Sequence, residues 1–160
     1  MGLEQHGCPP GAGRTVARLA KALERALGPL DLSLPQYRVL ALLGDGSTAA
    51  SVLARQLAVS PPSVTALIDG LVARGLVERE SDPEDRRRLT LLLTKAGRRA
   101  LIDADAAAEA RLAEIAGYLD DDEHEQEQVA ASLAGWGRAL DRSREERVSK
   151  GDPVKEAVRR

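Results

Sequence analysis

Apolar residues recur every three to four positions over most of the chain, and this spacing predicts helices. The first run starts near Arg14 and stops at the Gly-Pro pair at 28–29. Further runs cover about 35–43, 48–58 ("TAASVLARQLA"), 61–75 ("PPSVTALIDGLVARG"), 95–118 and 120–147. The predicted fold is therefore mainly α.

Residues that favour helix ends flank these runs. The candidate N-caps are Ser47 or Thr48, Ser60 and Thr94. Pro61 suits the first position of helix 61–75, where its missing N–H costs nothing. Gly75 suits the end of that helix, because glycine readily adopts the left-handed backbone that closes a helix.

After Gly75 the period of the pattern changes to two. "LVERE" at 76–80 alternates apolar and charged residues, and "RLTLLLT" at 88–94 is rich in residues that favour strands. The "SDPEDRR" stretch between them carries charges and turn-forming residues. We therefore expect a small β-hairpin with a charged tip.

Composition narrows the class of protein. Of the 160 residues, 43% are hydrophobic but only 2% are aromatic, so Leu, Ala and Val must fill the core. No apolar run approaches the roughly 20 residues of a membrane span, and the first residues lack the layout of a signal peptide. The one cysteine, Cys8, cannot form an intramolecular disulfide. A cytoplasmic protein with one main domain is expected.

Charge is segregated along the chain, although the formal net charge is only −2. The segment from Arg74 to Arg99 contains eight basic and five acidic residues, a net charge of +3. The segment from Leu101 to Gln128 contains ten acidic residues and one arginine, a net charge of −9. A local basic segment can bind a polyanion because the field near it decides the contact. The segment around the hairpin is thus a candidate nucleic-acid contact.

Two short helices joined by a tight link, the second capped by Ser60 and followed by a hairpin, form a winged helix-turn-helix. This module presents its second helix to the major groove of DNA. The sequence resembles the MarR family of bacterial transcription regulators over about 14–144, and most densely over 34–97. The resemblance rests on "LPQYRVLALL", "LARQLAVSPPSVTALIDGLVARGLVERE" and the hairpin pattern D-x-R-x5-L-T, formed by Asp85, Arg87, Leu93 and Thr94.

This resemblance implies a division of the chain. A winged helix-turn-helix is expected over 34–99, and helices for dimerisation over 14–33 and 100–147. Residues 1–13 read as a flexible arm and 148–160 as a frayed tail.

Helix 61–75 has two faces. The expected core face carries Val64, Leu67, Ile68 and Leu71. The opposite face carries Pro62, Ser63, Ala66, Asp69 and Gly70, with Thr65 at its edge. Many members of the family carry basic residues at the positions of Ala66 and Gly70, so this helix is expected to make few direct contacts with bases. Asp69 would repel phosphate unless an arginine neutralises it.

DNA contacts on this helix follow from its polar side chains. Hydroxyls of Ser60 and Ser63 can donate to phosphates, backbone amides at the helix start offer an anion site, and Thr65 can touch a base edge. The contacts predicted for this helix are Ser60, Pro62, Ser63, Thr65 and Arg74. The alternative is that Ser60 only caps the helix and Thr65 is only a surface residue.

For the hairpin tip, the resemblance implies that Arg87 enters the minor groove and that Asp85 holds its guanidinium. Arg86 and Arg88 would contact flanking phosphates. A solvated turn is the alternative for this charge run.

Apolar stripes on helix 14–27 and on the last helix exceed what the small central module can cover. The resemblance implies a homodimer that reads a pseudo-palindromic operator in double-stranded DNA. The predicted interface residues are Val16, Leu19, Leu23, Val129, Leu133, Trp136 and Leu140. Packing within one chain is the alternative.

The resemblance also implies a small-molecule effector that modulates DNA affinity, but no sequence feature identifies it. Other functions have weaker signals. Cys8 lies in the arm, unlike the thiol of peroxide-sensing relatives near the start of the first helix, so a redox sensor is a secondary alternative. His6 and His124 have no metal-ligand spacing, so no metal or cofactor is expected. Motifs of enzymes are not found. The alternative in another class is a winged-helix protein-interaction module without specific DNA binding.

Overall fold

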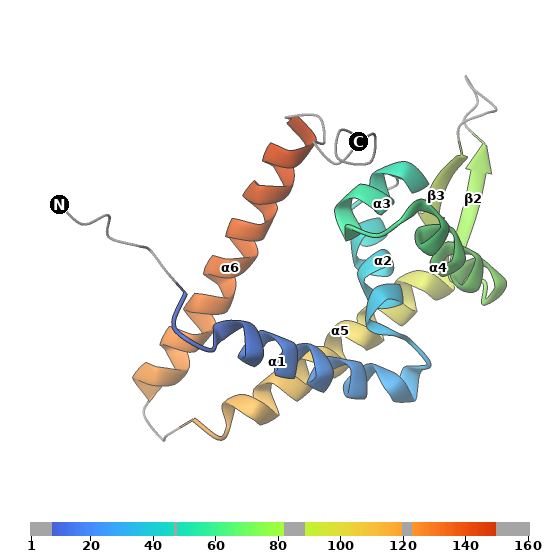
Figure 1. Ribbon diagram of the computed structural model, residues 1–160. Coiled ribbons are helices and arrows are strands. Elements are labelled where there is room, and N and C mark those ends of the chain that lie inside the picture. Colours follow the sequence, from blue (N-terminus) through green and yellow to red (C-terminus); the bar gives the residue numbers. More distant parts are fainter. Residues whose placement is uncertain (1–7, 47, 82–88, 120–122, 150–160) are drawn as a thin grey trace. The chain divides into compact units, whose positions relative to one another are not determined.

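The computed structural model describes residues 8–46, 48–81, 89–119 and 123–149 (Figure 1). Its elements are the helices α1 (Ala12–Leu27), α2 (Leu34–Gly44), α3 (Ala50–Leu57), α4 (Pro61–Ala73), α5 (Lys95–Ala116) and α6 (Glu123–Ser149), the 3₁₀ turn η1 (Gly28–Leu30) and the strands β1 (Thr48–Ala49), β2 (Val77–Ser81) and β3 (Leu89–Leu93). The expectation of a mainly helical chain with a β-hairpin is confirmed. In the described part of the chain, no helix has the length and apolarity that crossing a membrane requires.

The chain divides into two compact units, one up to Ala113 and one from Glu114. The first unit holds α1 to α4, the sheet and most of α5. Its core is built from Leu, Val and Ile side chains of α1, α2, α3, α4 and the strands, joined by Ala104 of α5. Leu40, Leu53 and Leu71 have no exposed surface. Aliphatic residues thus fill the core, as the composition predicts.

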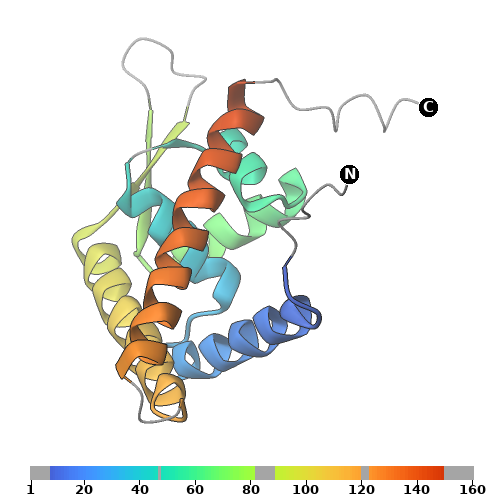
Figure 2. The same cartoon turned by 90° about the vertical axis from the view of Figure 1, so that its left-hand side faces the viewer.

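The sheet has three strands in the order β1-β3-β2, all antiparallel. Strands β2 and β3 lie side by side in both views (Figure 1, Figure 2). Their register pairs Val77 with Leu93 and Arg79 with Leu91, so these four side chains share one face. The short β1 was missed because two residues carry no periodic signal.

Most predicted helix ends are confirmed. Ser60 Oγ accepts from the backbone N–H of Ser63, and Thr94 Oγ1 accepts from the N–H of Gly97. Gly75 has a φ of +66° directly after α4. The predicted cap at Thr48 is wrong, because Thr48 belongs to β1 and Ala49 is the N-cap of α3. Ser47 lies outside the described residues.

Two helix starts differ from expectation. Helix α1 begins at Ala12, slightly inside the segment read as an arm, after Gly11 in the left-handed conformation. Helix α2 starts with a capping box that was not predicted from the sequence: Ser33 Oγ accepts from the N–H of Gln36, and Gln36 Oε1 accepts from the N–H of Ser33.

The base of the hairpin is joined closely to the start of α5. The carbonyl of Leu76 accepts from the N–H of Thr94 at 3.1 Å, and Thr94 Oγ1 donates to the carbonyl of Gly75 at 2.7 Å. Gly97 packs directly over this junction, since a Cβ at this position would lie 1.9 Å from the Leu76 carbonyl oxygen. Only a residue without a side chain fits there.

A hydrogen bond ties α2 to α5. The hydroxyl of Tyr37 donates to Asp105 Oδ1 at 2.7 Å in a half-buried site. Burial raises the pKa of the Tyr37 hydroxyl well above its usual range, and the hydrogen bond to Asp105 and the charges of Asp105 and Glu109 raise it further.

This raised pKa predicts a loss of stability in alkali. Below about pH 10 the Tyr37 hydroxyl is neutral in both states, whereas above it only the unfolded state ionises freely, so the free energy of unfolding falls as pH rises. The slope is at most about 1.4 kcal/mol per pH unit, and solvent at this half-buried site makes it smaller. Urea denaturation between about pH 9 and pH 11 measures it.

Tyr37→Phe is expected to remove that extra slope. Tyr118→Phe is the matched control, because it removes a hydroxyl from a tyrosine that is 86% exposed. Equal alkaline slopes for Tyr37→Phe and the parent would contradict this role of the hydrogen bond.

Candidate nucleic-acid interface

Helices α3 and α4 form the helix-turn-helix. The turn begins at Ala58, whose φ of 54° lies in the left-handed region, and its N–H donates to the carbonyls of α3. Val59 N–H donates back to the carbonyl of Ala54. Val64, Ile68 and Leu71 of α4 are buried as predicted. Leu67 is partly buried against the same core. The other face of α4 is thereby left toward solvent.

The start of α4 has few free backbone donors. Pro61 and Pro62 have no N–H, and the N–H of Ser63 is bonded to Ser60 Oγ. The expectation that backbone amides at this helix start form an anion site is therefore wrong. Hydroxyls remain as polar groups: Ser60 Oγ and Ser63 Oγ lie 2.7 Å apart and share a hydrogen bond.

The outer face of α4 is small and mostly uncharged. Exposed positions on it are Pro62, Ser63, Thr65, Ala66 and Asp69. Thr65 Oγ1 donates to the carbonyl of Pro61 at 3.0 Å, which leaves its methyl group and its acceptor lone pairs available.

Gly70 lies at the edge of this outer face, on the side toward α2. It is partly buried, and a Cβ there would lie 3.5 Å from Gln36 Nε2 of α2. A long basic side chain at position 70 would therefore start beside α2. Many family members carry a basic residue at this position, but its replacement by Gly70 is weaker evidence for reduced contact with bases than the sequence alone suggests.

Asp69 is neutralised by Arg79, an arginine outside the predicted site residues. Arg79 of β2 donates from Nη2 to Asp69 Oδ1 and forms an ion pair with it. The alternation of "LVERE" could have placed Arg79, since it shares a strand face with the buried Val77 and therefore points toward α4. The outer face of α4 thus carries a paired carboxylate.

Arg74, predicted to contact phosphate, is held by the protein itself. Its guanidinium donates to the backbone carbonyls of Asp31 and Leu30 next to η1 and lies 3.7 Å from the Asp31 carboxylate. These contacts brace the end of α4 against the turn between α1 and α2. A phosphate contact would have to use the remaining donors of Arg74 or replace these bonds.

Comparison with known proteins identifies the family. A sequence profile of the MarR family matches residues 30–88. The uncharacterized HTH-type transcriptional regulator YhbI of Bacillus subtilis is 36% identical over 116 residues, which cover 72% of this chain and 73% of YhbI. The chain belongs to the MarR family. Its relatives are transcriptional regulators and not enzymes.

Solved structures of the MarR family match the fold. CouR of Rhodococcus jostii RHA1, a transcriptional repressor bound to a 23-mer DNA duplex, aligns with a TM-score of 0.66 and 26% identity over 79% of this chain and 89% of CouR. The MarR family protein Rv2887 of Mycobacterium tuberculosis, in complex with salicylic acid, aligns with a TM-score of 0.67 and 27% identity over 82% of this chain and 98% of Rv2887.

The other residues predicted to have a role in this MarR-family protein lie in the hairpin tip, in α1, in α6 and before α1. The hairpin-tip residues Asp85, Arg86, Arg87 and Arg88 lie outside the described residues. Among the predicted interface residues, Val16, Leu133, Trp136 and Leu140 are exposed, and Leu19, Leu23 and Val129 are partly exposed. Cys8 is a free, exposed thiol before α1.

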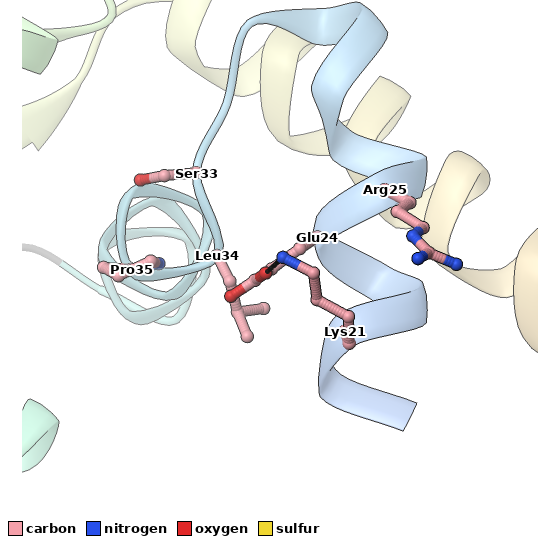
Figure 3. A pocket seen from close by; sticks show the side chains of 6 residues that line it. All are labelled: Lys21, Glu24, Arg25, Ser33, Leu34 and Pro35. Atoms are coloured by element: carbon pink, nitrogen blue, oxygen red, sulfur yellow. Dashed lines mark hydrogen bonds and ion pairs between the residues drawn. The ribbon is translucent and has the colours of Figure 1, made fainter. Parts of the chain in front are cut away.

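A shallow hollow of about 280 Å³ lies between α1 and the start of α2 (Figure 3). Lys21 and Glu24 line it from α1, and Ser33, Leu34 and Pro35 line it from the start of α2. Lys21 Nζ is bonded to Glu24 Oε2 at 2.7 Å, so the ammonium is already neutralised.

Proposed function

We propose that this MarR-family protein is a homodimeric, sequence-specific DNA-binding repressor. The main support is that the helix-turn-helix lies beside the β2–β3 hairpin within one compact unit. The outer face of α4 is exposed, and its one carboxylate is paired. The DNA complex of CouR, a relative of the same fold, supports this function. A protein-interaction module without DNA binding has no comparable support.

In this proposal α4 enters the major groove. Ser63 and Thr65 contact DNA through a hydroxyl and a methyl group, while Ser60 and Pro62 shape the helix start. Arg74 is better assigned to bracing α4. The wing, which is the β2–β3 hairpin with its tip, supplies the main positive charge: Arg87, oriented by Asp85, enters the minor groove, with Arg86 and Arg88 on phosphates.

Dimerisation is proposed through α1 and α6. None of the side chains described in α6 is buried, although this helix runs from Glu123 to Ser149. Helices draw most of their stability from packing of an apolar face. Leu133, Trp136 and Leu140 form such a face and are 48%, 56% and 59% exposed. A second copy of the chain would cover it and place two copies of α4 on a pseudo-palindromic operator.

A small-molecule effector is proposed to modulate DNA affinity. Structures of relatives with small molecules support this: Rv2887 with salicylic acid and CouR with p-coumaroyl-CoA. Such modulation requires that the effector bind the DNA-competent and DNA-incompetent shapes with different affinity.

Titration of a fluorescent duplex from the region upstream of the gene tests DNA binding. The logarithm of the association constant should fall with the logarithm of salt concentration, with a slope of about −0.9 per neutralised phosphate. Arg87→Ala should weaken binding to the specific duplex about 10-fold or more, because a hydrogen-bonded contact of a charged group is worth roughly 1.5–3 kcal/mol.

Arg18→Ala is the matched control, because it removes one positive charge from an exposed position of α1. It should bind DNA nearly as the parent does. Failure of the parent to bind at low salt would reject DNA binding, and parental affinity of Arg87→Ala would reject the role of the wing arginine.

A further inference from the structure

The ion pair between Asp69 and Arg79 lies between α4, the proposed recognition helix, and strand β2 of the sheet. Asp69 lies on the outer face of α4, and Arg79 extends from β2 on the sheet face that also carries Val77. The acidic neighbours Glu78 and Glu80 lie on the opposite face of β2. The guanidinium of Arg79 therefore places a positive charge beside the outer face of α4.

The pair is accessible from solvent. The side chain of Arg79 is 36% exposed and that of Asp69 is 56% exposed. A guanidinium has five N–H donors in a planar fork, and the bond to Asp69 comes from Nη2. Among the described residues, Asp69 takes only this donor, so the others can bind an oxyanion while Asp69 keeps the fork in place, and guanidinium is well suited to phosphate.

The surrounding charges make this group the natural phosphate contact of the helix. Arg79 is the only basic residue within α4 and β2, both of which are described in full. Arg74, just beyond α4, is bonded to the carbonyls of Asp31 and Leu30. The prolines at the start of α4 remove the backbone donors that another helix would offer there.

We propose that Arg79 is a further DNA-contacting residue, which Asp69 positions to bind a backbone phosphate where the recognition helix meets the wing. This inference rests on the proposed DNA-binding function and adds a contact to it. Asp69 acts through Arg79 and is a positioning residue. The competing role for Arg79 is to cancel the charge of Asp69 without touching DNA.

A charge-matched double variant separates the two roles. Asp69→Asn/Arg79→Gln has the same net charge as the parent but no guanidinium. If Arg79 binds phosphate, this variant should bind the duplex about 10-fold or more weakly, with a salt slope shallower by about 0.9 for each protomer. If Arg79 only neutralises Asp69, removing both charges should restore the parental Kd and slope, although Arg79→Gln alone would still weaken binding.

Lys21→Gln/Glu24→Gln is the matched control, because it removes an exposed ion pair from α1 without changing the net charge. It should keep the parental Kd and slope, and thermal unfolding should show all variants folded. If the parent binds no duplex at low salt, the proposed function and this inference both fall. If the parent binds and the Asp69/Arg79 double variant matches it in Kd and slope, only the assignment of Arg79 falls.

Discussion

Gly97→Ala is expected to lower the free energy of unfolding by about 3 kcal/mol or more, which is at the upper end for adding one methyl group. The new Cβ would lie 1.9 Å from the carbonyl oxygen of Leu76 and 2.9 Å from its carbonyl carbon. These are backbone atoms, and the carbonyl is already bonded to the N–H of Thr94. Relief therefore requires that α5 move away from the hairpin or that this bond break.

Chemical denaturation of the purified protein measures the effect. The matched control is Gly13→Ala in α1, where an added Cβ meets no atom within 4 Å. That variant should be neutral or more stable by about 0.5–1 kcal/mol, because alanine restricts the unfolded chain and favours helix. Equal stabilities for the two variants would show that α5 does not pack on Leu76 as closely as described.

Trp136→Glu is expected to convert the proposed dimer into a monomer and to weaken operator binding by about 100-fold or more. A carboxylate in the middle of an apolar interface loses its hydration without a partner, which costs several kcal/mol. Because Trp136 is 56% exposed in the chain alone, the substitution should leave the first unit folded. Light scattering at micromolar concentration reports the mass, and duplex titration reports the affinity.

Ala131→Glu is the matched control for this experiment. It adds the same charge to α6 at an exposed position, but the helical period puts it on the side opposite Leu133 and Trp136. This variant should stay dimeric. A Trp136→Glu protein with the mass of the dimer would contradict the assigned interface, and a monomeric parent would reject dimerisation at that concentration.

Features that depend on a few adjacent residues could be predicted from the sequence. The cap at Ser60, the proline start and glycine end of α4 and the alternation of β2 each occupy a few adjacent residues, and the structure contains them all. Strand β1 escaped prediction because it is only two residues long, and pairing with β3 defines it.

Parts of the fold and of the candidate site depend on residues far apart in the chain. Tyr37 and Asp105 are 68 positions apart, so only packing of α2 against α5 brings them together. The sequence predicts that an arginine must neutralise Asp69. Which arginine does so depends on the face of β2 that meets α4, and the structure shows that it is Arg79. The orientation of Gly70 toward Gln36 likewise follows from the crossing of α2 and α4.

The junction at Leu76, Thr94 and Gly97 has a mechanical consequence. Hydrogen bonds and direct contact without an intervening side chain leave no compliant layer between the hairpin and the first turn of α5. The hairpin and the first turn of α5 are therefore expected to rotate together as one rigid body. A small tilt of α5 would swing the strands through the same angle, so that displacement grows with distance from the pivot.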